Sequence, residues 1–132
     1  MKAIKVTAAI IIKNEKVFIA QRSKNDELSG KWEFPGGKIE SNETAQECLE
    51  RELFEEFGIR TKILDYLGES IFDYGNKLIH LLGYFTEHLS GDYILQVHQN
   101  CKWIDVNEFD DIDWAPADIE LVKQLKKKLT DQ

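Results

Sequence analysis

The chain has 132 residues, of which 42% are hydrophobic, and a formal net charge of −7. This length suits a single domain, residues 1–132, built around one hydrophobic core, and the lack of any run of about 18 apolar residues argues against a membrane-spanning helix. The acidic charge argues against a nucleic-acid duplex as partner, because contacts with the phosphate backbone need Lys and Arg.

The N-terminal segment differs from a signal peptide. Its apolar stretch, Ala8 to Ile12, is short and runs directly into Lys13 and further polar residues, which is typical of a strand and a turn. Cys48 and Cys101 lie far apart in sequence and lack metal-ligand spacing, so we expect both to be reduced and structural. These features favour a cytoplasmic location.

The first half of the chain predicts a β-hairpin, a polar loop, a short extended segment and a helix. Pro35, Gly36 and Gly37 end the extended segment as a turn. The helical pattern is closed by Gly58, because glycine readily takes the left-handed conformation found at helix ends. The predicted elements are, in this order, Val6–Ile12, Lys16–Gln21, Arg22–Lys31, Trp32–Phe34 and Ala45–Phe57.

The second half predicts further strands and a final helix that opens at Pro116. Gly75 and Asn76 form a turn between two of the strands. The alternation of strand and helix patterns predicts an α/β or α+β layer fold with a mixed sheet. The predicted elements are Lys62–Leu67, Glu69–Tyr74, Leu78–Glu87, Asn100–Asp105 and Pro116–Leu129. The apolar stripe predicted for the final helix consists of Ile119, Val122, Leu125 and Leu129.

The central helix carries three carboxylates on one stripe. At 100° per residue, Glu52, Glu55 and Glu56 fall within an arc of roughly 100°. Like charges at this spacing destabilise a helix unless they are compensated. Hard oxygen ligands at such density suit Mg²⁺ or Mn²⁺, so the stripe is a candidate metal site.

The alternative is a solvated acidic face of the helix. It is supported by two possible ion pairs at i,i+4 spacing, Glu47 with Arg51 and Glu56 with Arg60. The loop before the helix favours the metal site, since Gly36 and its neighbour Gly37 let the backbone approach a ligand closely. A Gly-Gly pair alone is also consistent with a plain turn.

The spacing of these residues resembles the Nudix box. Gly37 is followed after five residues by Glu43, and after seven more by the run from Arg51 to Ile59. This pattern matches the box at nine fixed or class-restricted positions over 23 residues. The run from Trp32 to Lys38 and the segment from Ala115 to Asp118 resemble MutT-type nucleotide pyrophosphohydrolases. Ile79-His80-Leu81 and the same Ala-Pro-Ala-Asp segment resemble the CTP pyrophosphohydrolase branch.

The resemblance implies a Nudix fold, a mixed sheet sandwiched between helices, with a metal site in the box. It implies that the Gly36 carbonyl and the side chains of Glu52, Glu55 and Glu56 are metal ligands. Arg51 is then expected to hold the catalytic carboxylates by ion pairing. The remaining implied roles are an orienting one for Glu43, catalysis by Glu52, and substrate contact for Gly37 and Lys38.

The chain departs from the MutT pattern in a late loop. MutT-type enzymes usually carry a further Glu about six residues before the Trp of the next strand, and here that position is Val97. Three explanations are open. Glu52 is the general base, or His98, next to Val97, takes the place of the missing Glu, or the chain has fewer metal ligands than MutT-type enzymes. His98 is otherwise an exposed loop residue.

Three residues are candidates for binding the nucleotide. Arg22 contacts phosphate or base, or is a solvated cation; Phe34 forms a pocket wall, or packs in the core. Asp118 matches the position at which MutT-type proteins read the base edge, and its alternative role is that of a helix N-terminal residue. An ionised Asp118 accepts from the cytosine amine, and a protonated one can donate to an oxidised guanine. The positive end of the helix dipole favours the ionised form.

The resemblance implies Mg²⁺-dependent hydrolysis, with Mn²⁺ also possible, of a nucleoside triphosphate to the monophosphate and pyrophosphate. The candidate substrates are 8-oxo-dGTP and CTP or a modified dCTP, and the process is sanitising of the nucleotide pool. The alternatives are a non-catalytic nucleotide sensor on the same fold and a Nudix hydrolase of another nucleoside diphosphate derivative. The expected partner is a small nucleotide, and we expect the chain to bind neither a nucleic-acid duplex nor a membrane. The chain is expected to be a monomer or a homodimer.

Overall fold

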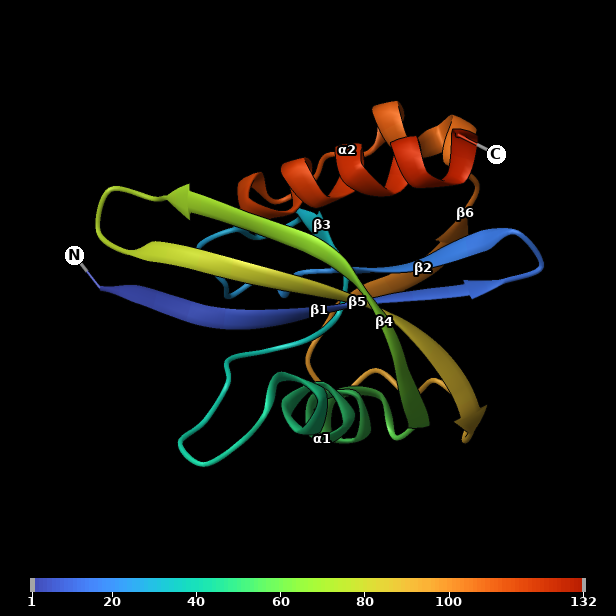
Figure 1. The fold of residues 1–132 in the computed structure, drawn as a ribbon, viewed down its shortest axis with the longest axis horizontal. Coiled ribbons are helices and arrows are strands. Elements are labelled where there is room, and N and C mark those ends of the chain that lie inside the picture. Colours follow the sequence, from blue (N-terminus) through green and yellow to red (C-terminus); the bar gives the residue numbers. More distant parts are fainter. Residues whose placement is uncertain (1, 132) are drawn as a thin grey trace.

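Six strands form one mixed sheet in the computed structural model, which describes residues 2–131 (Figure 1). The order of the strands is β3-β2-β1-β5-β4, and β6 also pairs with β2. β1 and β5 run parallel, whereas the other pairs are antiparallel. The strands are β1 (Ala3–Lys13), β2 (Lys16–Gln21), β3 (Trp32–Glu33), β4 (Arg60–Asp73), β5 (Leu78–Ser90) and β6 (Asn100–Ile104). The helices are α1 (Ala45–Phe57), the 3-10 helix η1 (Val106–Asp111) and α2 (Pro116–Thr130).

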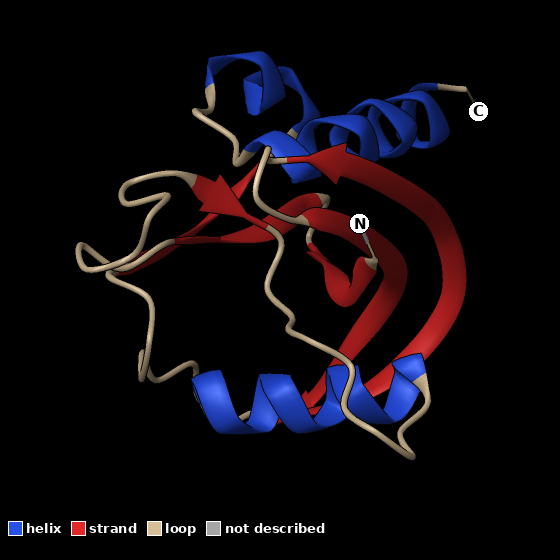
Figure 2. Ribbon diagram, turned by 90° about the vertical axis from the view of Figure 1, so that its left-hand side faces the viewer, coloured by secondary structure: helices blue, strands red, loops and turns tan. Residues whose placement is uncertain are grey.

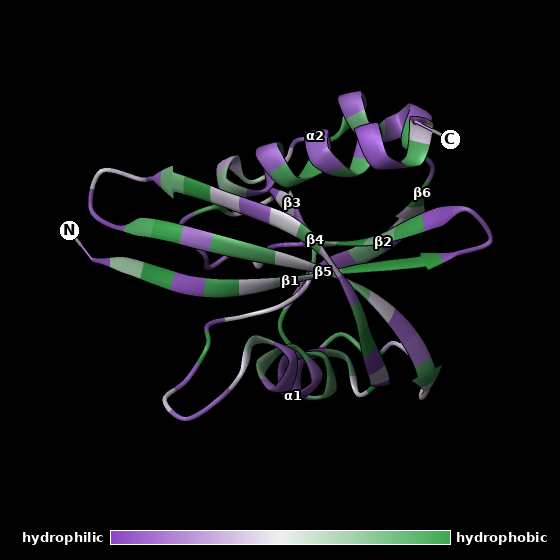
Figure 3. Cartoon of the chain, in the orientation of Figure 1, coloured by the Kyte–Doolittle hydropathy of each residue, from purple (hydrophilic) through white to green (hydrophobic). Residues whose placement is uncertain are grey.

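The sheet lies between α1 on one face and α2 on the other (Figures 1 and 2), which confirms the predicted sandwich. Alternate residues of β1 pack on opposite faces of the sheet. Ala8 and Ile10 pack in the cluster under α2, whereas Ala9 and Ile11 pack in the cluster under α1. A strand buried on both faces reads as a continuous apolar run, and Figure 3 shows this run in the middle of the molecule.

The two ends of α1 follow directly from its sequence. Thr44 and Glu47 form a capping box, in which the Thr44 side chain accepts from the Glu47 N–H and the Glu47 side chain accepts from the Thr44 N–H. Gly58 ends the helix in the left-handed conformation with φ 73°. The predicted bounds of this helix are therefore confirmed, but Glu47 is used for capping and does not form the ion pair with Arg51 that supported the alternative.

Two predictions for the second half were wrong. A single long strand, β4, replaces the two predicted strands around Gly68, since shifts of register between Ile63 and Gly68 absorb the irregularity without ending the strand. In α2 the buried stripe includes Leu121, which lies against the open face of Gly83, whereas Ile119 is 42% exposed. Val122 and Leu125 are buried and Leu129 packs against the core, so the predicted stripe is wrong only at Ile119.

The glycine loop after β3 is fixed against β1. The Thr7 N–H donates to the Gly37 carbonyl at 2.8 Å, and the Ala9 N–H donates to the Pro35 carbonyl at 2.7 Å. At Gly36 a Cβ atom would lie 2.0 Å from the Thr7 carbonyl oxygen, so only glycine fits this approach. This docking places the loop directly above α1.

Two further predictions concern the whole chain. Among residues 2–131, no helix is both long and apolar enough to cross a membrane. Cys48 and Cys101 are free cysteines, as predicted, and Cys48 is buried under the glycine loop.

Candidate active site

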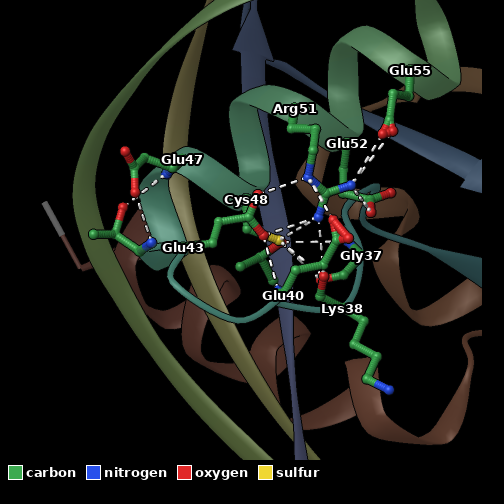
Figure 4. A network of polar contacts seen from close by, with 11 residues as sticks. Gly37, Lys38, Glu40, Glu43, Glu47, Cys48, Arg51, Glu52 and Glu55 are labelled. Carbon is green, nitrogen blue, oxygen red and sulfur yellow. Dashed lines mark hydrogen bonds and ion pairs between the residues drawn. The ribbon is translucent and has the colours of Figure 1, made fainter.

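Arg51 is the centre of an ion-pair network on α1 (Figure 4). Its guanidinium donates to both oxygens of Glu43 at 2.7 and 3.0 Å, to Glu52 at 2.8 Å and to Glu55 at 3.1 Å. The hydrogen bond from Arg51 lowers the pKa of Glu43 to about 2. The arrangement brings together Glu43, Arg51 and two of the box carboxylates, as the sequence predicted, although their roles in catalysis stay a prediction.

The same network ties the helix to the glycine loop. Arg51 Nη2 donates to the Lys38 carbonyl at 3.2 Å, and the Cys48 thiol lies 3.4 Å from that oxygen and 3.5 Å from the Gly37 carbonyl. Burial raises the pKa of Cys48 to about 11, so the thiol keeps its proton and can donate. The Lys38 side chain points away from the network (Figure 4).

A cavity of about 360 Å³ opens beside this network, between the glycine loop, α1 and the start of α2. Its volume is within the range of small-molecule sites. It brings together most of the residues predicted to bind metal or substrate. Those that line it are Arg22, Phe34, Gly36, Gly37, Lys38, Glu52, Glu56 and Asp118.

Glu56 lines the cavity from α1, with its side chain 12% exposed. Burial, followed by the charge of Glu52, raises its pKa to about 9. Its Oε1 atom is buried without a hydrogen-bond partner among the described residues. A carboxylate held in this way needs either a proton or a cation. The ion pair with Arg60 is absent, since the Arg60 guanidinium lies 4.2 Å from the centre of the Phe54 ring.

The donors around Glu56 suit a hard divalent cation. Glu52 is packed against Gly37, where an added Cβ would lie 2.2 Å from the Glu52 carboxyl carbon. Gly36, whose carbonyl is the predicted ligand, lies in the same lining. Carboxylate and carbonyl oxygens are the ligands that Mg²⁺ and Mn²⁺ prefer, so Glu52, Glu56 and Gly36 fit such an ion.

Glu55 is oriented differently from the other two box carboxylates. Its side chain is 51% exposed, pairs with Arg51 and does not line the cavity. Within residues 2–131, no three His, Cys, Asp or Glu side chains are arranged to hold a metal ion as they stand. Arg51 pairs with oxygens of both Glu52 and Glu55.

Arg22 lines the cavity and is held by two carboxylates, so it is not a solvated cation, and its contact with the substrate stays a prediction. It donates to both oxygens of Asp26 at 3.0 and 2.7 Å and to Glu33 at 2.7 Å. These contacts raise its pKa against the effect of burial. Asp26 and Glu33 both line the cavity and were missed by the sequence reasoning. The contact with Asp26 had one signal in the sequence, the i,i+4 spacing from Arg22, and the contact with Glu33 had none.

His98 is buried, contrary to the exposed loop residue that was the alternative to a catalytic role. Its side chain is 4% exposed and lies between two carboxylates, with Nε2 2.8 Å from Glu33 and Nδ1 3.7 Å from Glu56. Val97, at the position of the missing carboxylate, is 56% exposed and lines the cavity beside it.

Asp118 lies at the opposite end of the cavity. Its Oδ2 atom accepts from the Phe34 N–H at 3.0 Å. Burial, together with the charge of Glu33, raises the pKa of Asp118 well above its usual range. The expectation from the helix dipole was therefore wrong, because desolvation outweighs it. Phe34 serves both of its predicted purposes, since its ring packs 5.1 Å from that of Trp114 in the core and also lines the cavity.

The same sequence matches the model of the NUDIX domain over residues 3–125. The chain belongs to the NUDIX domain family. It is 36% identical to the CTP pyrophosphohydrolase of Escherichia coli K12, over 93% of this chain and 91% of that protein. It is 31% identical to an 8-oxo-dGTP diphosphatase of Haemophilus influenzae, over 94% and 93% of the two chains.

The NUDIX fold of the chain is also similar to solved structures. The solution structure of the Escherichia coli ORF135 protein superposes with a TM-score of 0.89 and 33% identity, and it covers 100% of this chain and 94% of that one. The predicted fold class is thereby confirmed. Glu52 and Glu56, which line the cavity, lie on α1, in the segment that the box motif predicted.

Proposed function

We propose that this protein hydrolyses a nucleoside triphosphate to the monophosphate and pyrophosphate, and so removes unwanted nucleotides from the pool. The observation that carries the proposal is the single cavity with carboxylates at one end and Asp118 at the other. A triphosphate chain at the carboxylate end places the base near Asp118. Relatives named for CTP and for 8-oxo-dGTP support the same class of substrate.

Mg²⁺, replaceable by Mn²⁺, is the cofactor in this proposal, held by Glu52, Glu56 and the Gly36 carbonyl. When bound, the ion shields the phosphate charge and lowers the pKa of the attacking water. Glu52 takes the proton from that water, and Arg51 fixes the Glu52 side chain through its 2.8 Å contact. The docked glycine loop brings backbone groups next to the phosphates without side chains in the way.

The proposed reaction is tested with a panel of nucleotides. Purified protein is incubated with Mg²⁺ and CTP, 5-methyl-dCTP, 8-oxo-dGTP or a nucleotide sugar, and release of pyrophosphate and monophosphate is measured. We expect pyrophosphate from at least one triphosphate, and none when the metal is chelated. Binding of a triphosphate without any turnover would contradict the proposal and indicate a sensor.

Asp118 is proposed to read the base in its protonated form. A neutral carboxyl offers a donor and an acceptor, as an Asn amide does. Asp118→Asn is therefore expected to keep kcat/KM for the preferred triphosphate within about fivefold. Asp118→Ala is expected to lose about 1–3 kcal/mol of transition-state binding, or roughly 5- to 150-fold in kcat/KM, as one base-edge contact is removed.

The two variants separate the alternatives. If Asp118 accepts in its ionised form, Asp118→Asn loses cytosine substrates selectively, and kcat/KM measured on CTP and 8-oxo-dGTP shows the change. An unchanged preference in both variants would remove Asp118 from the recognition site.

A further inference from the structure

His98 lies between Glu33 and Glu56, two carboxylates that line the cavity. Arg22 Nη1 donates to Glu33 Oε1 at 2.7 Å, and Glu33 Oε2 lies 2.8 Å from His98 Nε2. The other ring nitrogen, Nδ1, faces Glu56 Oε2 at 3.7 Å. A chain of side chains from the residue after β2, from β3 and from the loop before β6 thus ends on Glu56, the most buried of the three box carboxylates.

The loop that carries His98 is fixed by its backbone. The Ile94 N–H donates to the Phe57 carbonyl at 2.9 Å, and the Gln96 N–H donates to the Glu56 carbonyl at 3.2 Å. On the other side of His98, the Gln99 N–H donates to the Gln21 carbonyl at 3.0 Å. The loop therefore joins the end of α1 to the end of β2, and the histidine between these anchors is held at a defined place.

The ring itself is oriented by its neighbours. It stacks on Phe57, with ring centres 5.2 Å apart and an interplanar angle of 14°. Its Nε2 atom lies 2.8 Å from Glu33 Oε2, and the other oxygen of Glu33 accepts from Arg22. The remaining nitrogen is buried, has no hydrogen-bond partner among the described residues and faces Glu56.

We propose that His98 is a positioning residue that orients Glu56 toward the divalent cation, with Glu33 and Arg22 holding the imidazole in place. The inference rests on the proposed function, since it gives Glu56 the cation as its ligand. Both ring nitrogens face carboxylates, so neither is directed at a substrate water. Residues that contact and orient metal ligands typically contribute 10- to 100-fold to metal affinity.

The test measures metal binding in the absence of nucleotide. Free Mn²⁺ is titrated into the full chain and followed by its electron paramagnetic resonance signal. We expect His98→Ala to raise the Kd for Mn²⁺ by 10- to 100-fold while kcat at saturating metal falls by less than tenfold. Glu33→Gln is expected to give a smaller rise, because Gln keeps only one of the two acceptor contacts. The matched control is His88→Ala, on β5 outside the cavity, which leaves both quantities unchanged.

The outcomes distinguish this inference from the proposed function. If wild type binds Mn²⁺ and releases pyrophosphate but His98→Ala has an unaltered Kd, the positioning role is overturned and the proposed function stands. If wild type neither binds Mn²⁺ nor hydrolyses any triphosphate, the proposed function fails. Should His98→Ala be unfolded by circular dichroism, His98→Gln decides. Its amide can still donate to Glu33 but cannot reproduce the ring nitrogen at Glu56, so we expect a Kd at least fivefold above wild type, and an unaltered Kd contradicts the role.

Discussion

Glu56→Gln is expected to abolish most of the hydrolysis and, in the metal-free protein at pH 8, to raise the free energy of unfolding. The loss of activity follows from removing a negatively charged ligand of the cation. The gain in stability follows from burial, because the pKa of Glu56 is raised from 4.5 to about 9 in the folded chain. The folded protein must then keep this group protonated at a pH at which the unfolded chain ionises it freely.

The raised pKa of Glu56 determines the pH range over which its ionisation lowers the free energy of unfolding. Below pH 4.5 both states bind the proton, so Glu56 has no effect on stability through ionisation. Between pH 4.5 and about 9 the unfolded state alone is ionised, and the penalty grows by about 1.4 kcal/mol per unit of pH. Relaxation and entry of water reduce this cost, so we expect Gln to stabilise the protein by about 1–3 kcal/mol at pH 8 and by nearly nothing at pH 4.5.

The measurement is urea unfolding with a metal chelator at both pH values, together with pyrophosphate release at limiting Mg²⁺. Glu50→Gln, the same change on an exposed position of α1, is the control and alters neither quantity. A Glu56→Gln protein that is less stable than wild type at pH 8 would contradict the burial argument. Near-wild-type turnover at limiting Mg²⁺ would remove Glu56 from the metal site.

Local signals in the sequence predicted much of the fold. The bounds of α1 were predicted correctly because Thr44 and Gly58 determine its ends through short-range geometry. The loop around Gly36 and the carboxylate stripe were found for the same reason, since their spacing is contained in one loop and one helix. Leu121 was missed from the stripe of α2 because it is buried against Gly83, which is far away in sequence.

The electrostatics of the site could not be read from spacing. Arg22 and Glu33 are 11 positions apart, and Glu33 and His98 are 65 apart, so their contacts depend on the packing of β2, β3 and the late loop. The ionisation of Asp118 is a similar case. Its position at a helix N-terminus favours the charged form, whereas its burial in the folded protein raises its pKa.

Glu52→Gln is expected to lower kcat by about 10²- to 10⁴-fold at saturating Mg²⁺, the range for loss of a general base. Glu52 is the carboxylate that lies both in the cavity and in the Arg51 network, with its side chain 19% exposed. Its other side lies against Gly37, so it borders the loop where the phosphates are proposed to lie. An amide in its place keeps the size and the contact with Arg51 but accepts no proton at neutral pH.

Steady-state kinetics on the preferred triphosphate decide between Glu52 and His98 as the base. Loss of an interaction made only in the transition state lowers kcat and kcat/KM equally, so we expect this pattern for Glu52→Gln. For His98→Ala, by contrast, we expect a higher metal requirement and a kcat within about tenfold of wild type once Mg²⁺ is saturating. Glu52→Asp, which keeps a carboxylate one methylene further back, is expected to recover part of the rate. A kcat that falls by about a hundredfold or more in His98→Ala at saturating metal, with Glu52→Gln nearly unaffected, would assign the proton transfer to the histidine.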